Sequence, residues 1–471
     1  MNILEALDDP ALFRPHFRGD TWKPWLTFLA ALFALPMDDA ALELYQHHTG
    51  RQDAPTAAFK EATLVIGRRG GKSRILALIA VFLATFRDYE AYLAPGEVAT
   101  IAIIAADRRQ ARSIFRFTLG LLRAVPMLAG MIQDETADTI TLKNRVVIEI
   151  ATASFRVTRG YTFAAVLADE VAFWRSDDSA NPDQEIIGAL RPGLATIPSA
   201  ILLLASSPYR KRGVLYATHA RHFGQNEARV LVWQATTLEM NPSLDPRIIE
   251  EAYADDPESA SAEYGAQFRS DLSDFVPRDV INACTQLDRF EIAPASGRKY
   301  VAFIDPSGGT GTDSMTLAIA HREGDRAILD AVREVRPPFS PETVTGDFAR
   351  VLKTYGITRV TGDRYAGEWP RERLRAHGIQ YDLSDQPKSD IYRDCLPLLN
   401  SGRAELLNLP RLASQFCGLE RRTSRSGRDS IDHAPGAHDD IANVVAGVLL
   451  LANAASTVKP SHFTNFNFIG R

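Results

Sequence analysis

The fold is decided by the stretch Thr63-Leu64-Val65-Ile66-Gly67-Arg68-Arg69-Gly70-Gly71-Lys72-Ser73. A long apolar run begins two residues after it. Its first four residues predict a buried strand, and the apolar run predicts a helix. Between them, glycines let backbone N–H groups close around a phosphate, and the helix N-terminus adds a partial positive charge. We expect a cradle for the phosphates of ATP, in which Lys72 reaches the β- and γ-phosphates and the Ser73 hydroxyl ligates Mg²⁺. Its other members are Gly67, Arg68, Arg69, Gly70 and Gly71.

The loop departs from the usual GxxxxGK[ST] spacing, because Ile66 stands where the first glycine is expected. The alternative is a glycine-containing surface turn beside a basic cluster. The strand before the loop and the helix after it favour the phosphate cradle.

An apolar strand ending in two carboxylates supplies the partner that a phosphate loop requires. It reads Ala164-Ala165-Val166-Leu167-Ala168-Asp169-Glu170. Asp169 is expected to hold the nucleotide's Mg²⁺ through water, and Glu170 to polarise the attacking water. Taken alone, the pair is more typical of an acidic helix cap. Together with the phosphate loop, it predicts ATP hydrolysis, and a later strand ending in Ser206-Ser207 could sense the γ-phosphate.

Apolar strands alternate with helices through the first half of the chain, which predicts a mainly parallel sheet covered on both faces. The 471 residues exceed one ordinary core. We predict a P-loop ATPase domain over residues 1–234, with a helical segment over 1–60. A lid and linker over 235–296 and a second α/β domain over 297–455 follow. The tail, 456–471, is expected to be poorly ordered.

Composition sets limits on location and partners. Hydrophobic residues make up 45% and charged residues 24%, as in soluble globular proteins. Neither a signal peptide nor a membrane-spanning run is visible, and three scattered cysteines fit a reducing cytosol. The net charge of −5 means that any binding of nucleic acid uses local basic patches.

The second domain places acids at the ends of successive elements. Asp305 follows the strand 300–304, Asp363 follows 359–362, and Asp439 and Asp440 open the last apolar helix. Two carboxylates at ~4 Å repel by about 4 kcal/mol at an effective dielectric near 20. Two Mg²⁺ or Mn²⁺ ions between them would remove this repulsion and could clamp a phosphodiester for in-line attack. Singly, each acid is more typical of a cap or turn residue than of a metal ligand. Asp440 shares the apolar stripe of its helix, so we favour it over Asp439 as the principal ligand.

These motifs resemble those of the large terminase subunits of tailed bacteriophages. That family has a deviant phosphate loop with an arginine four residues before the lysine, here Arg68. The Asp-Glu strand end and the order of the later acids are also similar to the family. The resemblance implies an ASCE/RecA-like P-loop ATPase domain followed by a ribonuclease-H-like nuclease domain. It further implies that Arg68 contacts the γ-phosphate and that Arg159 acts across a subunit boundary as an arginine finger. A structural hydrogen bond is the alternative for Arg159.

The implied function is packaging of double-stranded DNA into a procapsid, driven by ATP, with cleavage of concatemeric DNA. The implied partners are a portal protein, a small terminase subunit and further copies in a ring of five. The implied location is the host cytoplasm, at the procapsid portal during packaging and outside the mature virion, with no membrane. Alternatives are a gene-transfer-agent or prophage packaging protein, a non-packaging ATPase-nuclease, and a scaffold that binds DNA without cutting it. Two arginine groups, at 108–116 and 421–428, are DNA-binding candidates or simply solvated basic faces. The second group lies in a Ser/Gly-rich stretch, which predicts a flexible loop from Arg421 onward.

Overall fold

The computed structural model describes residues 1–153, 160–174, 182–363, 369–423, 429–434 and 437–454. The chain divides into two compact units, the first ending at Asp271 and the second beginning at Leu272. The predicted lid and linker, residues 235–296, is divided at this boundary.

The first unit is built on one sheet with the strand order β3-β4-β5-β2-β6-β7-β1-β8. Strands from β5 to β8 along this order run parallel, and β3 and β4 add an antiparallel edge. The predicted, mainly parallel sheet is therefore confirmed. The strands are β1 Glu61–Ile66, β2 Ala99–Ala105, β3 Ile132–Glu135, β4 Thr139–Leu142, β5 Val146–Thr152, β6 Thr162–Asp169, β7 Ile201–Ser206 and β8 Val230–Ala235.

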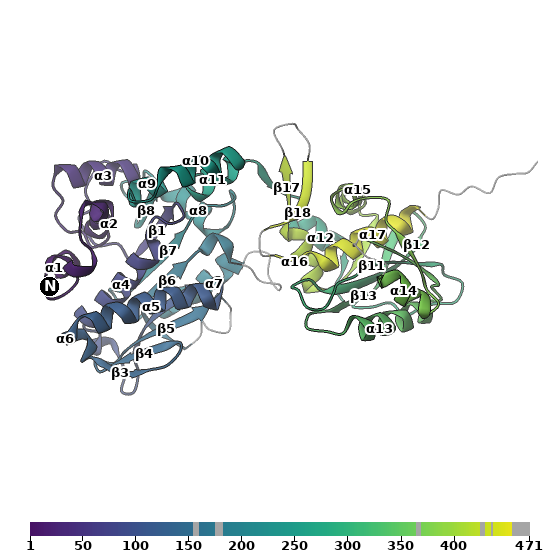
Figure 1. Cartoon of the computed structure of the whole chain (residues 1–471), viewed down its shortest axis with the longest axis horizontal. Coiled ribbons are helices and arrows are strands. Elements are labelled where there is room, and N and C mark those ends of the chain that lie inside the picture. The colour runs from purple at the N-terminus through teal and green to yellow at the C-terminus, as the bar shows by residue number, and fades with distance from the viewer. Residues whose placement is uncertain (154–159, 175–181, 364–368, 424–428, 435–436, 455–471) are drawn as a thin grey trace, which may run out of the picture. The chain divides into compact units, whose positions relative to one another are not determined.

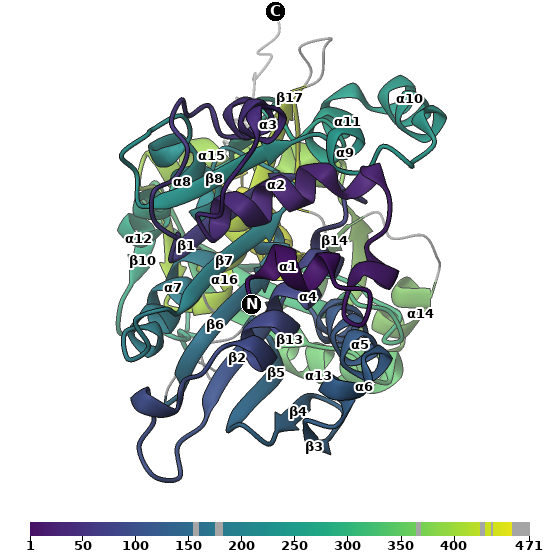
Figure 2. The same ribbon diagram turned by 90° about the vertical axis from the view of Figure 1, so that its left-hand side faces the viewer.

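Helices cover both faces of this sheet (Figures 1 and 2). Side chains of α2, α4 and α5 share one core with the sheet, and those of α7 and α8 share the other. Strands β1, β7 and β6 are neighbours in the sheet and run parallel. The phosphate loop after β1 and Asp169 at the end of β6 therefore lie at the same edge of the sheet. This is the predicted ASCE-type P-loop fold. The helices are α1 Ile3–Asp8, α2 Lys23–Leu32, α3 Asp39–Thr49, α4 Lys72–Phe86, α5 Arg108–Ala124, α6 Pro126–Ala129, α7 Pro182–Leu190, α8 Gly213–His222, α9 Thr237–Met240, α10 Pro246–Asp255 and α11 Pro257–Glu263.

The second unit is built on a sheet of order β10-β16-β13-β12-β11-β14-β15. Strands β11, β12 and β13 form an antiparallel ribbon, and β14 and β15 extend it in parallel from β11. This is the predicted ribonuclease-H-like arrangement. Its strands are β10 Thr285–Gln286, β11 Tyr300–Asp305, β12 Met315–Glu323, β13 Arg326–Val335, β14 Arg359–Gly362, β15 Gln380–Leu383 and β16 Ala404–Leu407.

A small antiparallel sheet accompanies it, with β17 (Leu419–Thr423) between β9 (Leu272–Asp274) and β18 (Asp429–His433). The sequence predicts a flexible loop from Arg421 onward, and this is wrong for Arg421 and Arg422. Both lie on β17 and pair with strands on either side. Arg425 and Arg428 lie outside the described residues.

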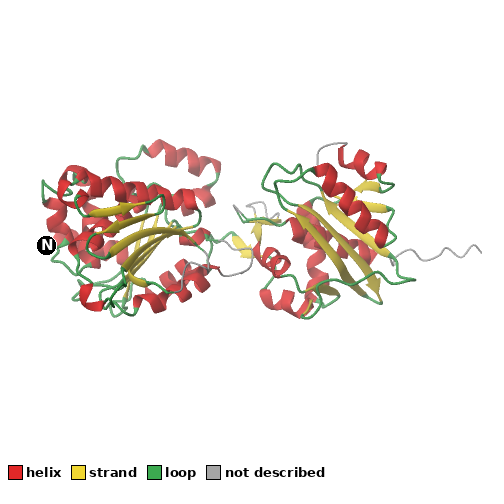
Figure 3. Ribbon diagram, turned by 90° about the horizontal axis from the view of Figure 1, so that it is seen from below, coloured by secondary structure: helices red, strands yellow, loops and turns green. Residues whose placement is uncertain are grey.

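Helix α17 (Asp440–Ala454) packs against β11, β12 and β13. It shares its core with α12, α15 and α16, while α13 and α14 cover the other face (Figure 3). Within the described ranges, each helix is too short or too polar to span a bilayer. The remaining helices are α12 Arg278–Cys284, α13 Pro341–Thr354, α14 Trp369–Ala376, α15 Lys388–Asn400 and α16 Pro410–Gly418.

The close approach of α17 to the sheet depends on Gly447. A Cβ atom at this position would lie 2.5 Å from the ring of Phe303 on β11. Gly447→Ala is therefore expected to lower the free energy of unfolding by about 1–3 kcal/mol through overpacking. Denaturant unfolding of the full chain measures this change. Gly418→Ala is the matched control, because a Cβ there meets open space. Equal stability of the two variants would contradict the packing.

Two candidate catalytic sites

The loop after β1 turns through two residues with left-handed backbone, Arg69 at φ 66° and Gly71 at φ 100°. Helix α4 begins directly afterwards at Lys72, whose side chain is only 5% exposed. The Lys72 ammonium donates to the carbonyl oxygens of Ile66 at 3.0 Å and Gly67 at 3.4 Å. The lysine predicted to meet the phosphates therefore lies inside the loop that would cradle them.

Side chains from distant elements hold the loop in this shape. The Trp25 indole donates to the Gly70 carbonyl at 2.9 Å. From the segment after β8, the side chains of Thr237 and Asn241 donate to the carbonyls of Arg68 and Arg69. The Arg68 guanidinium pairs with Glu263 at 3.0 Å. Residues 235–263 thus support the loop, and the predicted contact of Arg68 with a γ-phosphate stays a prediction.

Two carboxylates lie beside the loop at the end of β6. Asp169 is buried, and Glu170 follows with a left-handed backbone at φ 48°. The Lys72 ammonium is 3.6 Å from the Glu170 carboxylate, which also accepts from the Ser206 hydroxyl at 3.1 Å. Burial raises the pKa of Asp169 and the Glu170 charge adds to this, while Lys72 and a hydrogen bond from Ser73 oppose it. The structure therefore brings together the four residues expected to act on ATP and its Mg²⁺.

In the second unit, the four predicted acids line one pocket of about 430 Å³. Asp305 ends β11, Asp363 follows β14, Asp439 precedes α17 and Asp440 opens it. The pKa of Asp305 is raised to about 7, chiefly by burial; a hydrogen bond from Asn443 lowers it, and the charges of the other three acids contribute to the rise. The arrangement concentrates negative charge in a site that excludes much of the solvent.

Asn443, which the sequence motifs did not reveal, connects two of the acids that line this pocket. Its amide nitrogen donates to Asp305 at 2.9 Å and to Asp363 at 3.2 Å. The side chain is buried, and its Oδ1 atom has no hydrogen-bond partner among the described residues. The available signal is its spacing, since Asn443 lies three residues after Asp440 and so on the same helix face.

The two neighbouring acids of α17 have different partners. Asp439 contacts the Lys388 ammonium at 3.0 Å and accepts from the Tyr392 hydroxyl at 2.7 Å. Asp440 accepts from the backbone N–H of Ser314 at 3.2 Å. A cation and a hydroxyl already compensate Asp439, which favours Asp440 as the principal ligand. The four carboxylates form an all-oxygen donor set of the kind that suits Mg²⁺ or Mn²⁺.

Residues 63–189 match the family described as terminase large subunit, T4likevirus-type, N-terminal. The resemblance to large terminase subunits is confirmed. No curated protein matches the chain. The large terminase of bacteriophage HK97 is 17% identical, with 91% of this chain and all of that chain covered at a TM-score of 0.39. A large terminase from a thermophilic bacteriophage is 12% identical to this chain. The alignment covers 84% of this chain and 95% of that chain, with a TM-score of 0.38. The large terminase nuclease of another thermophilic phage, G20c, is 15% identical to this chain. The alignment covers 36% of this chain and 95% of that chain, with a TM-score of 0.33.

Two of the sequence-based predictions fall on residues that the structure does not describe, and two arginines of α5 have a partner within the protein. Arg159 and the tail from 456 lie outside the described residues. On α5, Arg108 pairs with Asp138, and Arg112 lies 3.9 Å from the same carboxylate. This pairing accounts for two members of the 108–116 arginine group without a nucleic acid.

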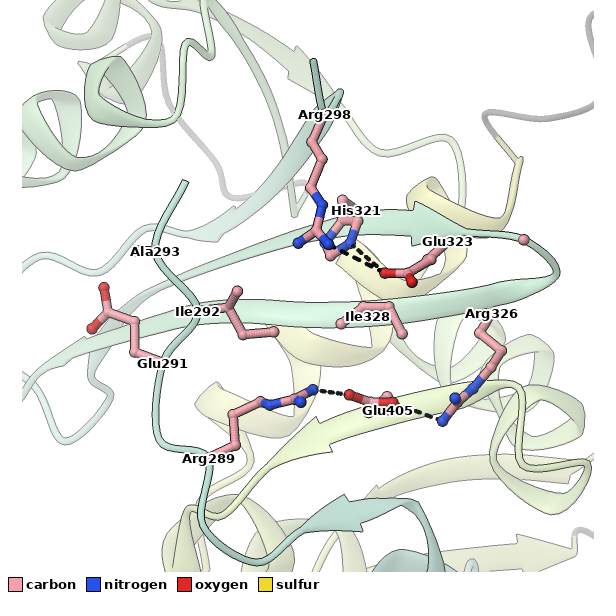
Figure 4. A pocket seen from close by; sticks show the side chains of 11 residues that line it. Arg289, Glu291, Ile292, Ala293, Arg298, His321, Glu323, Arg326, Ile328 and Glu405 are labelled. Atoms are coloured by element: carbon pink, nitrogen blue, oxygen red, sulfur yellow. Dashed lines mark hydrogen bonds and ion pairs between the residues drawn. The ribbon is translucent and has the colours of Figure 1, made fainter. Parts of the chain in front are cut away.

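A further pocket of about 710 Å³ lies where β12 ends and β13 begins, at the end of the sheet opposite to Asp305 (Figure 4). Glu405 lies between Arg289 and Arg326 and pairs with both, and Arg298 approaches Glu323 at 3.4 Å. Acidic and basic side chains compensate one another here, in contrast to the acid pocket.

Repulsion in the acid pocket leads to a stability prediction. In chelator, Asp305→Asn should raise the free energy of unfolding by on the order of 1–4 kcal/mol, because it removes one of several buried like charges. Mn²⁺ should stabilise the wild-type chain by mass action and stabilise the variant less. Thermal unfolding with and without Mn²⁺ measures both effects. A variant that is less stable than wild type in chelator would show that the acids do not repel.

Proposed function

We propose that this chain is a packaging motor subunit that hydrolyses ATP to move double-stranded DNA into a procapsid and cuts that DNA with a two-metal nuclease. The observation that carries the proposal is the presence of two separate carboxylate sites in one chain. One lies against a lysine inside a phosphate loop. The other is an all-oxygen pocket in a ribonuclease-H-like unit.

In the first site, the Lys72 ammonium neutralises charge on the β- and γ-phosphates. Ser73 and Asp169 hold the Mg²⁺ of ATP, Ser73 directly and Asp169 through water. Glu170 orients and polarises a water molecule for attack on the γ-phosphorus. Its contact with Ser206 links the state of the γ-phosphate to β7.

In the second site, Asp305, Asp363 and Asp440 hold two Mg²⁺ or Mn²⁺ ions, with Asp439 as a further ligand or as the anchor of Lys388. The ions supply an activated water and charge stabilisation for both oxygens of an in-line displacement at phosphorus. Asn443 orients the Asp305 and Asp363 carboxylates toward them.

The terminase resemblance supports the partners that we propose: a portal protein, a small terminase subunit, the procapsid, and a ring of copies, five in number. Arg68 then contacts the γ-phosphate once it leaves Glu263, and Arg159 completes the site of a neighbouring copy. The motor works in the host cytoplasm at the portal.

Two variants of the full chain separate the activities. Glu170→Gln should lower the kcat of ATP hydrolysis by at least about 100-fold and leave nucleotide binding and plasmid cleavage unchanged. Asp305→Ala should abolish Mn²⁺-dependent plasmid cleavage and leave ATP hydrolysis unchanged. Phosphate release and agarose gels of supercoiled plasmid measure the two activities.

The exposed residues Glu185 and Asp325 provide matched controls as Glu185→Gln and Asp325→Ala, which should retain both activities. Wild-type ATP hydrolysis by Glu170→Gln would refute the motor assignment. Loss of both activities in either site variant would refute the division into two independent sites.

A further inference from the structure

Three potential metal ligands meet where the end of α3 approaches α9 in the first unit. His47 and His48 occupy the last turn of α3, and Glu239 belongs to α9. One ligand atom from each residue lies within 4.8 Å of the other two. Figure 2 shows α3, β8 and α9 at the same edge of this unit. Carbonyl dipoles at a helix C-terminus also favour a cation.

The imidazole of His48 is held in place by packing and by one hydrogen bond. The side chain is 2% exposed and packs against Trp233, with 4.9 Å between ring centroids. Its Nδ1 atom lies 3.1 Å from the Gln234 carbonyl oxygen. Because a carbonyl only accepts, Nδ1 carries a proton, which leaves Nε2 as the ring atom available to a metal. Burial lowers the pKa of His48. Metal-binding histidines commonly have such a hydrogen bond to a carbonyl.

The carboxylate of Glu239 is fixed at one oxygen and directed to the histidines by the other. Oε2 accepts from the backbone N–H of Thr236 at 2.6 Å, and Oε1 lies 2.9 Å from His47 Nε2. Burial opposes ionisation of Glu239, but hydrogen bonds from His47 and Thr236 outweigh it and lower its pKa. An ionised carboxylate therefore faces two imidazoles.

We propose that His47, His48 and Glu239 bind one divalent transition-metal ion of the zinc class, with water as the fourth ligand. Two imidazoles and one carboxylate are a typical three-ligand set for Zn²⁺, whereas Mg²⁺ prefers oxygen ligands alone. Tetrahedral ligands at 2.0–2.2 Å from zinc lie about 3.3 Å apart. The ligand atoms now lie within 4.8 Å of one another, so they must approach more closely to bind zinc. The exposed side chain of His47 and the partly exposed side chain of Glu239 can move by this amount while His48 stays in place.

The ion would tie α3 to the segment that supports the phosphate loop. Helix α9 carries Thr237, which holds the Arg68 carbonyl, and Asn241 holds the Arg69 carbonyl directly after it. An ion pair between His47 and Glu239 alone is the competing explanation. It leaves unexplained why the buried imidazole of His48 lies beside that pair.

The test uses Co²⁺ as a probe with the full chain and excess Mg²⁺, which occupies the all-oxygen sites. We expect one Co²⁺ per chain with the intense visible absorption of tetrahedral coordination, and its displacement by Zn²⁺ in calorimetry. His47→Ala and Glu239→Gln should each weaken binding by at least about tenfold. His16→Ala, which alters a histidine outside the cluster, should bind as wild type does. His47 and Glu239 are chosen because changing buried His48 could impair folding.

The proposal is overturned if wild type shows no tetrahedral Co²⁺ absorption, or if His47→Ala and Glu239→Gln bind Co²⁺ with wild-type affinity. The assay needs neither ATP nor DNA. Its failure is therefore distinguishable from a failure of the packaging function.

Discussion

Carboxylates buried close together repel one another, and the two units of this chain compensate this negative charge in different ways. Beside the phosphate loop, the Lys72 ammonium lies 3.6 Å from Glu170 and opposes the effect of burial on Asp169. Beside α17, Lys388 is directed to Asp439, while Asp305 accepts from the neutral amide of Asn443. In the first site, a lysine of the protein itself therefore compensates part of the carboxylate charge. In the proposed nuclease, metal ions would supply the remaining compensation of the second site.

The direction of the strands places these charges. In the first unit, β1, β7 and β6 are parallel neighbours, so the phosphate loop, Ser206 and Glu170 follow strands that end at one edge. In the second unit, β11 and β14 are parallel neighbours, and Asp305 and Asp363 follow their ends. Helix α17 then adds its first turn to that edge, where the absence of a side chain at Gly447 permits close packing on Phe303. Backbone architecture thus fixes which acids meet.

Much of this arrangement can be predicted from the sequence, since apolar strands and the residues directly after them are local patterns. The fold class, the parallel sheet and the loop around Lys72 follow from such patterns. Asn443 could not be found in this way, because an asparagine inside an apolar helix shows its role only when Asp305 and Asp363 approach from other elements. The same holds for Trp25, Thr237 and Asn241, which reach the phosphate loop from far along the chain. The prediction of a loop at Arg421 and Arg422 is wrong because their strand contains none of the usual apolar alternation.

The central claim is that the second unit leaves its acid cluster to be neutralised by metal ions. Anomalous X-ray diffraction from crystals of the full chain grown with Mn²⁺ tests it most directly. The account predicts two anomalous peaks about 4 Å apart, between the carboxylates of Asp305, Asp363 and Asp440. An acid pocket without a peak at saturating Mn²⁺ would contradict it.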